Sequence, residues 1–454
     1  MFTSLNPASG ETIATYPTIT TPEMRAALRG SAKAWQGWRR TTFADRAQRM
    51  HMIGRLLRER ADAHSRLMAL EMGKPIAAGR AESMKCATAC DYYAEHAEQF
   101  LADEVIATDA SRSYVHYEPI GTLLAIMPWN FPFWQVLRVA APTLMAGNVV
   151  VLKHAANVPG CALAIEELFR DAGFPAGVFQ SLFVDHAQLK AAIRHRAVRA
   201  VTLTGSNRAG RAVAKLAGDN LKKAVLELGG SDAYLILADA DLDLAVEACV
   251  TSRLINTGQS CIAAKRFIVV DAVRAEFELR VVERMKQAKM GDPLDESNSV
   301  GPMARPDLRA ALHDQVTRTV AKGARLLLGG AVPAGPGAFY PPTVLTEVAR
   351  GMAAYEEELF GPVAAIIPVK NDKAAIKVAN DSVFGLGAAV FTRDVARGER
   401  IAATELDVGS AFVNAFVRSD ARLPFGGTKA SGYGRELSRQ GVLEFVNVKT
   451  VYLA

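Results

Sequence analysis

The sequence predicts an α/β protein built on two mainly parallel sheets. Residues 21–100 are rich in Ala, Arg, Glu, Leu and Met and poor in Gly and Pro, which is typical of helices. From about residue 112, short apolar runs rich in β-branched residues alternate with segments of helical composition. Because these runs contain few polar positions, they fit strands covered on both faces, as in a parallel sheet.

The alternation places each element in order. In the first part of the chain, the apolar runs predict strands at 121–127, 148–152, 200–204, 224–227, 233–237 and 266–270. The helical segments 158–172 and 208–217 have the length of crossover connections between parallel strands. A second alternation runs through 324–328, 364–369, 372–380 and 388–391. We therefore expect two α/β domains that join near residue 230.

Composition excludes several classes of protein. The chain has 454 residues, enough for two or three domains, with 50% hydrophobic and 22% charged residues. These values exclude a disordered chain, a collagen-like chain and a disulfide scaffold. The net charge of +6 comes from 53 basic and 47 acidic residues that are mixed along the chain. Without a basic block, we expect no nucleic-acid partner.

Cysteine usage and the N-terminus favour a cytoplasmic protein. Five cysteines are an odd number and sparse, which favours a reducing compartment. Residues 1–17 have neither a basic n-region nor an apolar h-region, so we expect no secretory signal. Residues 119–137 lack charge, but three prolines interrupt them. A buried strand followed by a turn fits this stretch better than a membrane span.

One cysteine stands in a different context from the other four. Cys261 ends the turn-like segment 256–261, Asn-Thr-Gly-Gln-Ser-Cys, where a thiol can be exposed and activated. The others lie in segments of helical composition and fit core packing; they are Cys86, Cys90, Cys161 and Cys249. On this context alone, Cys261 is a candidate nucleophile, and a structural role stays open.

Three further segments are candidates for chemistry. Glu227 ends a predicted strand beside a Gly pair, where partial burial would raise its pKa towards that of a general base. Asn130 is held between two prolines in Pro-Trp-Asn-Phe-Pro, and a fixed amide suits an oxyanion hole. Ser206 follows a predicted strand and starts a helix, which suits an anion, although the dinucleotide fingerprint Gly-x-Gly-x-x-Gly is absent. The alternative for Glu227 is a structural ion pair, and the alternative for Asn130 is a capping role. The alternative for Ser206 is an ordinary turn.

Five segments together resemble the aldehyde dehydrogenase superfamily. They occur in the family's order: Pro-Trp-Asn-Phe-Pro at 128–132, Leu-Glu-Leu-Gly-Gly at 226–230, Gly-Gln-Ser-Cys at 258–261, Glu-Glu-Leu-Phe-Gly-Pro-Val at 357–363 and Pro-Phe-Gly-Gly at 424–427. The spacing of 34 residues between Glu227 and Cys261 also matches. Within the superfamily, the segments 152–158, 289–293 and 431–438 are most similar to bacterial succinate-semialdehyde dehydrogenases.

The resemblance implies an aldehyde dehydrogenase-like architecture in three parts. A Rossmann-type cofactor domain would use residues 1–106 and 121–229, and an α/β catalytic domain would span 230–428. A small oligomerisation β-sheet would come from 107–120 and 429–454. In this family such strands extend a partner's sheet, so the resemblance implies a homodimer or homotetramer.

The resemblance also implies the roles of the catalytic residues. Cys261 would attack the aldehyde as a thiolate, and Asn130 with the Cys261 backbone N–H would hold the oxyanion. Hydride transfer would leave a thioester on Cys261, and Glu227 would activate the water that releases the acid. The reaction needs no metal, and the sequence shows no cluster of metal ligands.

Cofactor contacts follow from the same match. They are expected at Trp129, Lys153, Ala156, Gly205, Ser206, Leu228, Gly229, Glu358 and Phe360. Ala156 stands where many NAD-preferring members have a glutamate that bonds the ribose. Alanine neither bonds the 2′-hydroxyl nor repels a 2′-phosphate, so the choice of NAD or NADP stays open, and we expect NAD to be favoured and NADP to be accepted.

Substrate choice is expected to depend on Arg138 and Ser419. Arg138 falls where the succinate-semialdehyde group has an arginine for the substrate carboxylate. The group's second substrate arginine is replaced by Ile255, so polar residues such as Ser419 would share the role. The expected reaction is NAD(P)-dependent oxidation of succinate semialdehyde to succinate. The alternative substrates are glutarate semialdehyde and an uncharged aldehyde. The alternative role for Arg138 is an ion pair with a structural acid. The alternative to an enzyme is a catalytically silent relative.

Overall fold

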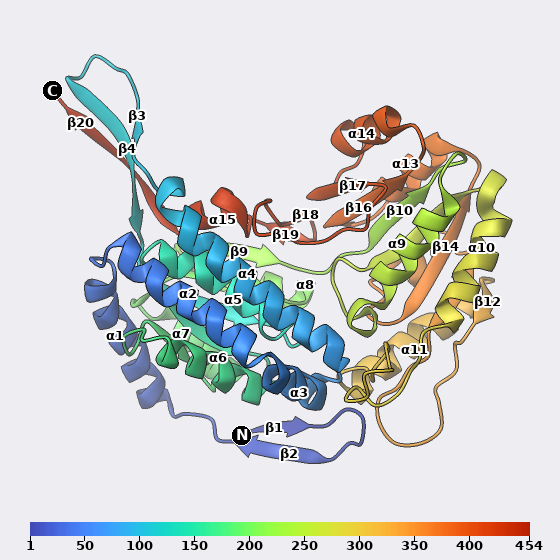
Figure 1. Cartoon of the computed structure of the whole chain (residues 1–454), viewed down its shortest axis with the longest axis horizontal. Coiled ribbons are helices and arrows are strands. Elements are labelled where there is room, and N and C mark those ends of the chain that lie inside the picture. The colour runs from blue at the N-terminus through green and yellow to red at the C-terminus, as the bar shows by residue number, and fades with distance from the viewer.

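The computed structural model describes all 454 residues and confirms the predicted α/β class. Two large sheets form separate lobes, and a narrow antiparallel arm extends from one of them (Figure 1). The N-terminal half of the chain builds the lobe with most helices, and residues from about 230 build the other lobe. The C-terminal segment returns to the first lobe.

The N-terminal region is helical, as predicted, after a short hairpin. Two of its helices begin at capping boxes, Thr20 with Glu23 and Thr42 with Asp45, which satisfy the free N–H groups of the first turn. The elements are β1 (Phe2–Leu5), β2 (Thr12–Tyr16), α1 (Thr21–Trp38), α2 (Phe43–Glu59), α3 (Ala61–Met72) and α4 (Ile76–Phe100). Helix α4 packs on α2, on α3 and on the later helix α5 (Trp134–Met145), and therefore forms a wall beside the first sheet.

The first large sheet has the strand order β19-β9-β8-β5-β6-β7. Its strands are β5 (Thr122–Met127), β6 (Val149–His154), β7 (Phe179–Ser181), β8 (Val198–Thr204), β9 (Lys223–Glu227) and β19 (Gly432–Tyr433). All neighbours are parallel except β19 and β9. The connecting helices are α5 (Trp134–Met145), α6 (Pro159–Asp171), α7 (His186–Arg194) and α8 (Asn207–Gly218).

The second large sheet has the order β12-β13-β14-β11-β10-β16-β17. Its strands are β10 (Asp232–Ile236), β11 (Ala264–Val270), β12 (Arg325–Leu328), β13 (Thr343–Thr346), β14 (Val363–Val369), β16 (Gly387–Phe391) and β17 (Ser410–Val413). The accompanying helices are α9 (Leu242–Leu254), α10 (Asp271–Lys286), α11 (Pro306–Ala321), α12 (Ala353–Glu356), α13 (Asp372–Asn380) and α14 (Val395–Thr404). The central strands β11 and β10 are buried on both faces, which explains their apolar residues from Phe267 and from Ala233 onwards. Residues near their N-terminal ends are charged and buried; they are Lys265 and Arg266 in β11 and Asp232 in β10.

The arm is a three-stranded antiparallel sheet of β3 (Glu104–Val105), β4 (Arg112–Pro119) and β20 (Val446–Leu453). Strand β20 pairs with β4 along its whole length, from Val446 opposite Pro119 to Leu453 opposite Arg112. Of the segment 429–454, only β20 reaches the arm. Strand β19 pairs with β9 of the first sheet, and α15 (Ser438–Leu443) packs on α4 and α5, because its apolar residues are covered there.

The uncharged stretch 119–137 forms β5, a turn and the start of α5. None of the helices is both long and apolar enough to span a bilayer. A short antiparallel pairing of β15 (Phe384–Gly385) with β18 (Thr428–Lys429) completes the fold.

Candidate active site

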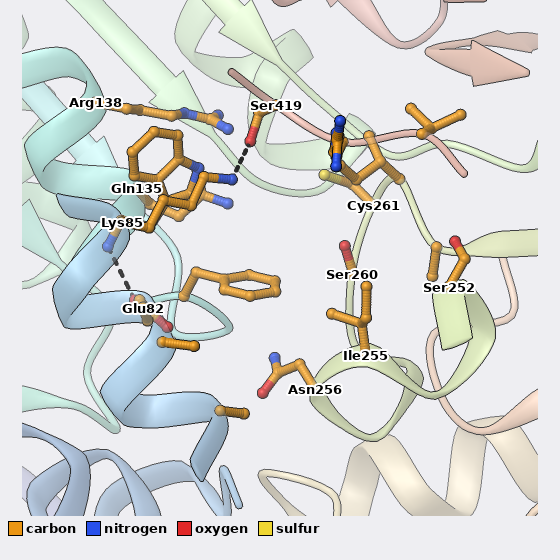
Figure 2. Close-up of a pocket in the computed structure, with 18 of the residues that line it drawn as sticks. Glu82, Lys85, Gln135, Arg138, Ser252, Ile255, Asn256, Ser260, Cys261 and Ser419 are labelled. Atoms are coloured by element: carbon orange, nitrogen blue, oxygen red, sulfur yellow. Dashed lines mark hydrogen bonds between the residues drawn. The ribbon is translucent and has the colours of Figure 1, made fainter. Parts of the chain in front are cut away.

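A cavity of about 350 Å³ lies between residues from the two halves of the chain. Helices α4 and α5 form one side, and the loop 255–263 with the segment 416–425 forms the other (Figure 2). Aromatic and aliphatic side chains make up much of the lining, among them Phe131, Trp134, Ile255 and Phe425. Such a cavity holds a small molecule with an apolar middle and a few polar groups.

Cys261 lines this cavity because of an unusual loop before it. The 3₁₀ turn Ile255–Gly258 contains Asn256 and Thr257 in the left-handed region, at φ of 54° and 57°. Gly258 has φ of 73°, and a Cβ there would lie 2.2 Å from the carbonyl oxygen of Gly361. Only glycine fits so close to another backbone. The loop is therefore pressed against 361 and directs Cys261 into the cavity, whereas the other four cysteines are buried.

Two cationic side chains, Lys265 and Arg138, act on the backbone and the thiol of Cys261. Burial raises the pKa of Cys261 to about 12, and the positive charges of Arg138 and Lys265 oppose this shift. The Lys265 ammonium donates to the carbonyl oxygens of Ser260 at 2.9 Å and Cys261 at 2.7 Å. Lys265 is itself buried, so its charge acts on the loop through a medium of low dielectric constant.

Asn130 is hydrogen-bonded to the loop that carries Cys261, although it is not among the residues that line the cavity. Its side-chain Nδ2 donates to the backbone carbonyl of Gln259 at 3.1 Å, and its backbone carbonyl accepts from Nδ2 of Asn256 at 2.7 Å. These bonds fix Asn130 against the loop two residues before the thiol. The second N–H of the Asn130 amide and the backbone N–H of Cys261 have no acceptor in the protein. Both donors are free for a developing oxyanion.

Glu227 is buried at the end of β9, and neither of its carboxylate oxygens has a hydrogen-bond partner. Burial raises its pKa well above the usual range, and the nearby Glu436 carboxylate adds to the shift. Glu227 does not line the cavity with Cys261. It lies beside Gly426, whose neighbour Phe425 forms part of the cavity wall. Action on a group at Cys261 therefore requires the Glu227 side chain to turn.

The residues expected at the cofactor phosphates lie at the carboxyl ends of parallel strands. Gly205 follows β8, and Ser206 is the N-cap of α8, where its side chain accepts from the backbone of Ala209. The N-terminus of this twelve-residue helix faces the same edge of the sheet as Lys153 at the end of β6. Lys153 is half-buried, has no carboxylate partner, and has its pKa lowered by burial. Ala156 is exposed.

A second group of expected cofactor residues surrounds Glu358. Its carboxylate accepts from the backbone N–H of Gly230 at 3.1 Å and lies 3.4 Å from Lys265. A Cβ on Gly229 would lie 2.5 Å from the Glu358 carboxylate, so a larger residue there would displace this side chain. Leu228 is buried beside Gly229. Trp129 and Phe360 make an edge-to-face contact with ring centres 5.7 Å apart.

Arg138 and Ser419 both line the cavity, but they have protein partners. Arg138 is 1% exposed, forms an ion pair with Glu436 and donates to the hydroxyl of Thr204 at 3.3 Å. Arg138 therefore pairs with a structural acid, which is the alternative that the sequence left open for this residue. Ser419 accepts a hydrogen bond of 2.7 Å from the ammonium of Lys85. Ile255 lines the cavity, and Arg253 is buried and donates to the carbonyl of Gly258.

Lys85 and Glu82 were not predicted from the sequence, although both line the cavity. They lie on α4, where charged residues usually face solvent, and no motif separates them from the other charges of residues 21–100. Glu82 pairs with the buried Lys74 and accepts from the backbone N–H groups of Phe133 and Trp134, so it caps the start of α5. Only the packing of α4 on α5 brings these side chains to the site.

The chain belongs to the aldehyde dehydrogenase family. The model of this family matches residues 1–451. The fold and the cavity geometry agree with this membership, and the class predicted from the sequence is confirmed.

Among known proteins, the chain is similar to several succinate-semialdehyde dehydrogenases. The chain is 49% identical over 449 residues to succinate semialdehyde dehydrogenase [NAD(P)+] Sad of Escherichia coli, covering 99% of this chain and 97% of that protein. It is 48% identical to a probable succinate-semialdehyde dehydrogenase [NADP(+)] of Synechocystis, covering 99% of each. A crystal structure of succinic semialdehyde dehydrogenase from Streptococcus pyogenes with NADP+ is similar at a TM-score of 0.98 and 37% identity, covering all of both chains.

Proposed function

We propose that this enzyme oxidises succinate semialdehyde to succinate with NAD or NADP. One observation carries the substrate: the cavity has a thiol on one side and a group of cationic and hydroxyl side chains on the other, with apolar residues between them. A four-carbon aldehyde acid has the same order of groups, since its aldehyde and carboxylate are separated by two methylenes. The names of the relatives support this choice of substrate.

The proposed chemistry begins at Cys261. Its thiolate attacks the aldehyde carbon, and the oxyanion of the thiohemiacetal is held by the amide of Asn130 and the backbone N–H of Cys261. Arg138 and Lys265 favour the thiolate through their charge. Loss of hydride from the former aldehyde carbon leaves a thioester on Cys261.

Glu227 is proposed as the base for the second half of the reaction. Its raised pKa means that it can take a proton from water, as a general base requires. The carboxylate turns from its place beside Gly426 towards the thioester, and the activated water releases succinate and the thiol. The absence of hydrogen bonds to Glu227 makes this rotation inexpensive, because no bond has to break.

The cofactor site is proposed from residues that fit a dinucleotide. When bound, the cofactor supplies the hydride acceptor. Ser206 and Gly205 at the start of α8 would hold the pyrophosphate, Lys153 and the region of Ala156 the adenosine ribose, and Glu358 the nicotinamide ribose. Trp129, Leu228, Gly229 and Phe360 would border the nicotinamide. Exposed Ala156 presents no negative charge to a 2′-phosphate, which supports use of both cofactors.

Steady-state kinetics test the substrate assignment. We expect kcat/KM for succinate semialdehyde to exceed that for butanal, which has the same chain length without the carboxylate, by at least about 100-fold, since a desolvated charge-assisted bond is worth about 1.5–3 kcal/mol and a second polar contact adds to it. Glutarate semialdehyde is the length control. NADH and NADPH formation are measured separately. Equal values for butanal would refute the carboxylate recognition and leave an aldehyde dehydrogenase for uncharged substrates.

We also propose that the arm makes a homodimer or a homotetramer in the cytoplasm. Several apolar side chains of the arm are exposed in the single chain, and they include Val105, Val448, Tyr452 and Leu453. Exposed apolar residues on a sheet with free edges indicate pairing with another chain. Light scattering of the full chain should give a dimer or tetramer, and a chain that ends at Phe445 should give a smaller species. A monomeric full chain would refute the proposal.

A further inference from the structure

Lys85 is the half-buried cation in the cavity that lacks a carboxylate partner. Four charged residues line the cavity: Glu82, Lys85, Arg138 and Arg418. Glu82 is neutralised by Lys74, and Arg138 by Glu436. Arg418 has no carboxylate partner, but it is exposed to solvent at the rim, where water screens its charge.

The contacts of Lys85 direct its ammonium towards the cavity. Its Nζ lies 4.2 Å from the ring centre of Trp134 and donates to the Ser419 hydroxyl at 2.7 Å. Figure 2 shows Lys85 and Ser419 joined by this bond, with Cys261 on the opposite side of the drawn cavity. An ammonium has three N–H donors, so two remain after the bond to Ser419. The Ser419 hydroxyl hydrogen also has no acceptor in the protein.

We propose that Lys85, together with Ser419, binds the carboxylate of the aldehyde substrate, and that Arg138 serves mainly to hold Glu436 and the cavity wall. This inference rests on the proposed function and names the substrate contact. The donors of Lys85 and Ser419 match the oxygens of one carboxylate, and the carboxylate supplies the counter-charge that Lys85 lacks. Arg138 already has that counter-charge, so a second carboxylate would crowd two like charges around it.

The preference of the site for a carboxylate substrate should fall as the pH rises. Burial, with a smaller contribution from the positive charge of Arg138, lowers the pKa of Lys85 to about 8, although Cys86, Glu82 and Asp420 act in the opposite direction. The facing segment contributes the cation Arg418, the hydroxyl of Ser419 and the acid Asp420, which is paired with Arg422. As the pH rises through about 8, the free enzyme loses the ammonium charge. The ratio of kcat/KM for succinate semialdehyde to that for butanal should therefore fall, and effects of Cys261 ionisation cancel in this ratio.

The test compares Lys85→Met with Lys85→Arg and two controls. Lys85→Met keeps the length of the side chain and removes its charge, so KM for succinate semialdehyde should rise about 10- to 100-fold while kcat/KM for butanal stays within about threefold. Lys85→Arg should retain most of the preference. Arg80→Met removes a charge from the same helix outside the cavity, and Arg418→Met removes the rim charge; both should keep the preference.

A binding measurement separates this inference from the proposed function. Succinate should slow alkylation of Cys261 by iodoacetamide in the parent enzyme, and about tenfold more succinate should be needed in Lys85→Met. If the parent shows no preference for succinate semialdehyde over butanal, the proposed function fails. If the parent shows the preference and Lys85→Met keeps both it and succinate protection, Lys85 is not the anchor. If Arg418→Met, and not Lys85→Met, loses the preference for succinate semialdehyde over butanal, the substrate carboxylate binds Arg418 at the rim.

Discussion

Replacing Cys261 with alanine should lower kcat for succinate semialdehyde by at least about 10⁴-fold, because loss of a covalent nucleophile removes the whole pathway through its intermediate. The fold should be retained, since Cys261 is half-buried at a cavity and alanine adds no atoms. The measurement is the initial rate of NADH or NADPH formation, with thermal unfolding recorded for the same preparation.

The matched control is Cys249→Ala. Cys249 is buried in α9 away from the cavity, and its pKa is raised by burial alone, so it is a packing residue. This variant should lose stability and keep kcat within a few-fold. Activity of Cys261→Ala close to that of the parent would remove Cys261 as the nucleophile.

Replacing Glu227 with glutamine should separate the two halves of the reaction. The amide cannot take a proton from water, so steady-state turnover should fall about 10²- to 10⁴-fold, the contribution of a positioned general base. Thioester formation does not use this carboxylate. One equivalent of reduced cofactor per active site should therefore form in a rapid burst, followed by a slow phase, as stopped-flow absorbance would record.

Hydroxylamine provides the control for this variant. It cleaves thioesters without a protein base, so it should restore the slow phase of Glu227→Gln and have little effect on the parent enzyme. A burst that is lost together with turnover would place Glu227 in the first half of the reaction. An unchanged steady-state rate would exclude it as the base.

The sequence predicted most strands of the two large sheets, because their apolar runs are short, β-branched and bounded by Gly, Pro or polar residues. It missed the short strands β7, β13 and β17. The boundaries differ by one or two residues, for example β8 at Val198–Thr204 against the expected 200–204. The path of the C-terminal segment was harder to predict. Strand β19 has only two residues, and its pairing with β9 depends on the tertiary contact and not on local sequence.

The candidate site was predictable where chemistry depends on local motifs. Cys261 lies on the loop 255–263 and Asn130 donates to Gln259 of the same loop, while their catalytic roles stay predictions. Charge partners across the fold were not predictable. Glu436 is 298 residues from Arg138 in the sequence, and nothing near either residue indicates the ion pair. The position of Lys85 at the cavity was not predictable for the same reason. Its local sequence is that of any lysine in a helical region, and only the packing of α4 against α5 brings it to the site.

Mass spectrometry of the quenched Glu227→Gln enzyme tests whether the reaction passes through a thioester on Cys261. After mixing with succinate semialdehyde and NAD or NADP, the peptide that contains Cys261 should gain the mass of one succinyl group, in an amount equal to the burst of reduced cofactor. The adduct should disappear on addition of hydroxylamine. A burst of reduced cofactor without a succinyl group on Cys261, or with the group on another residue, would contradict the account.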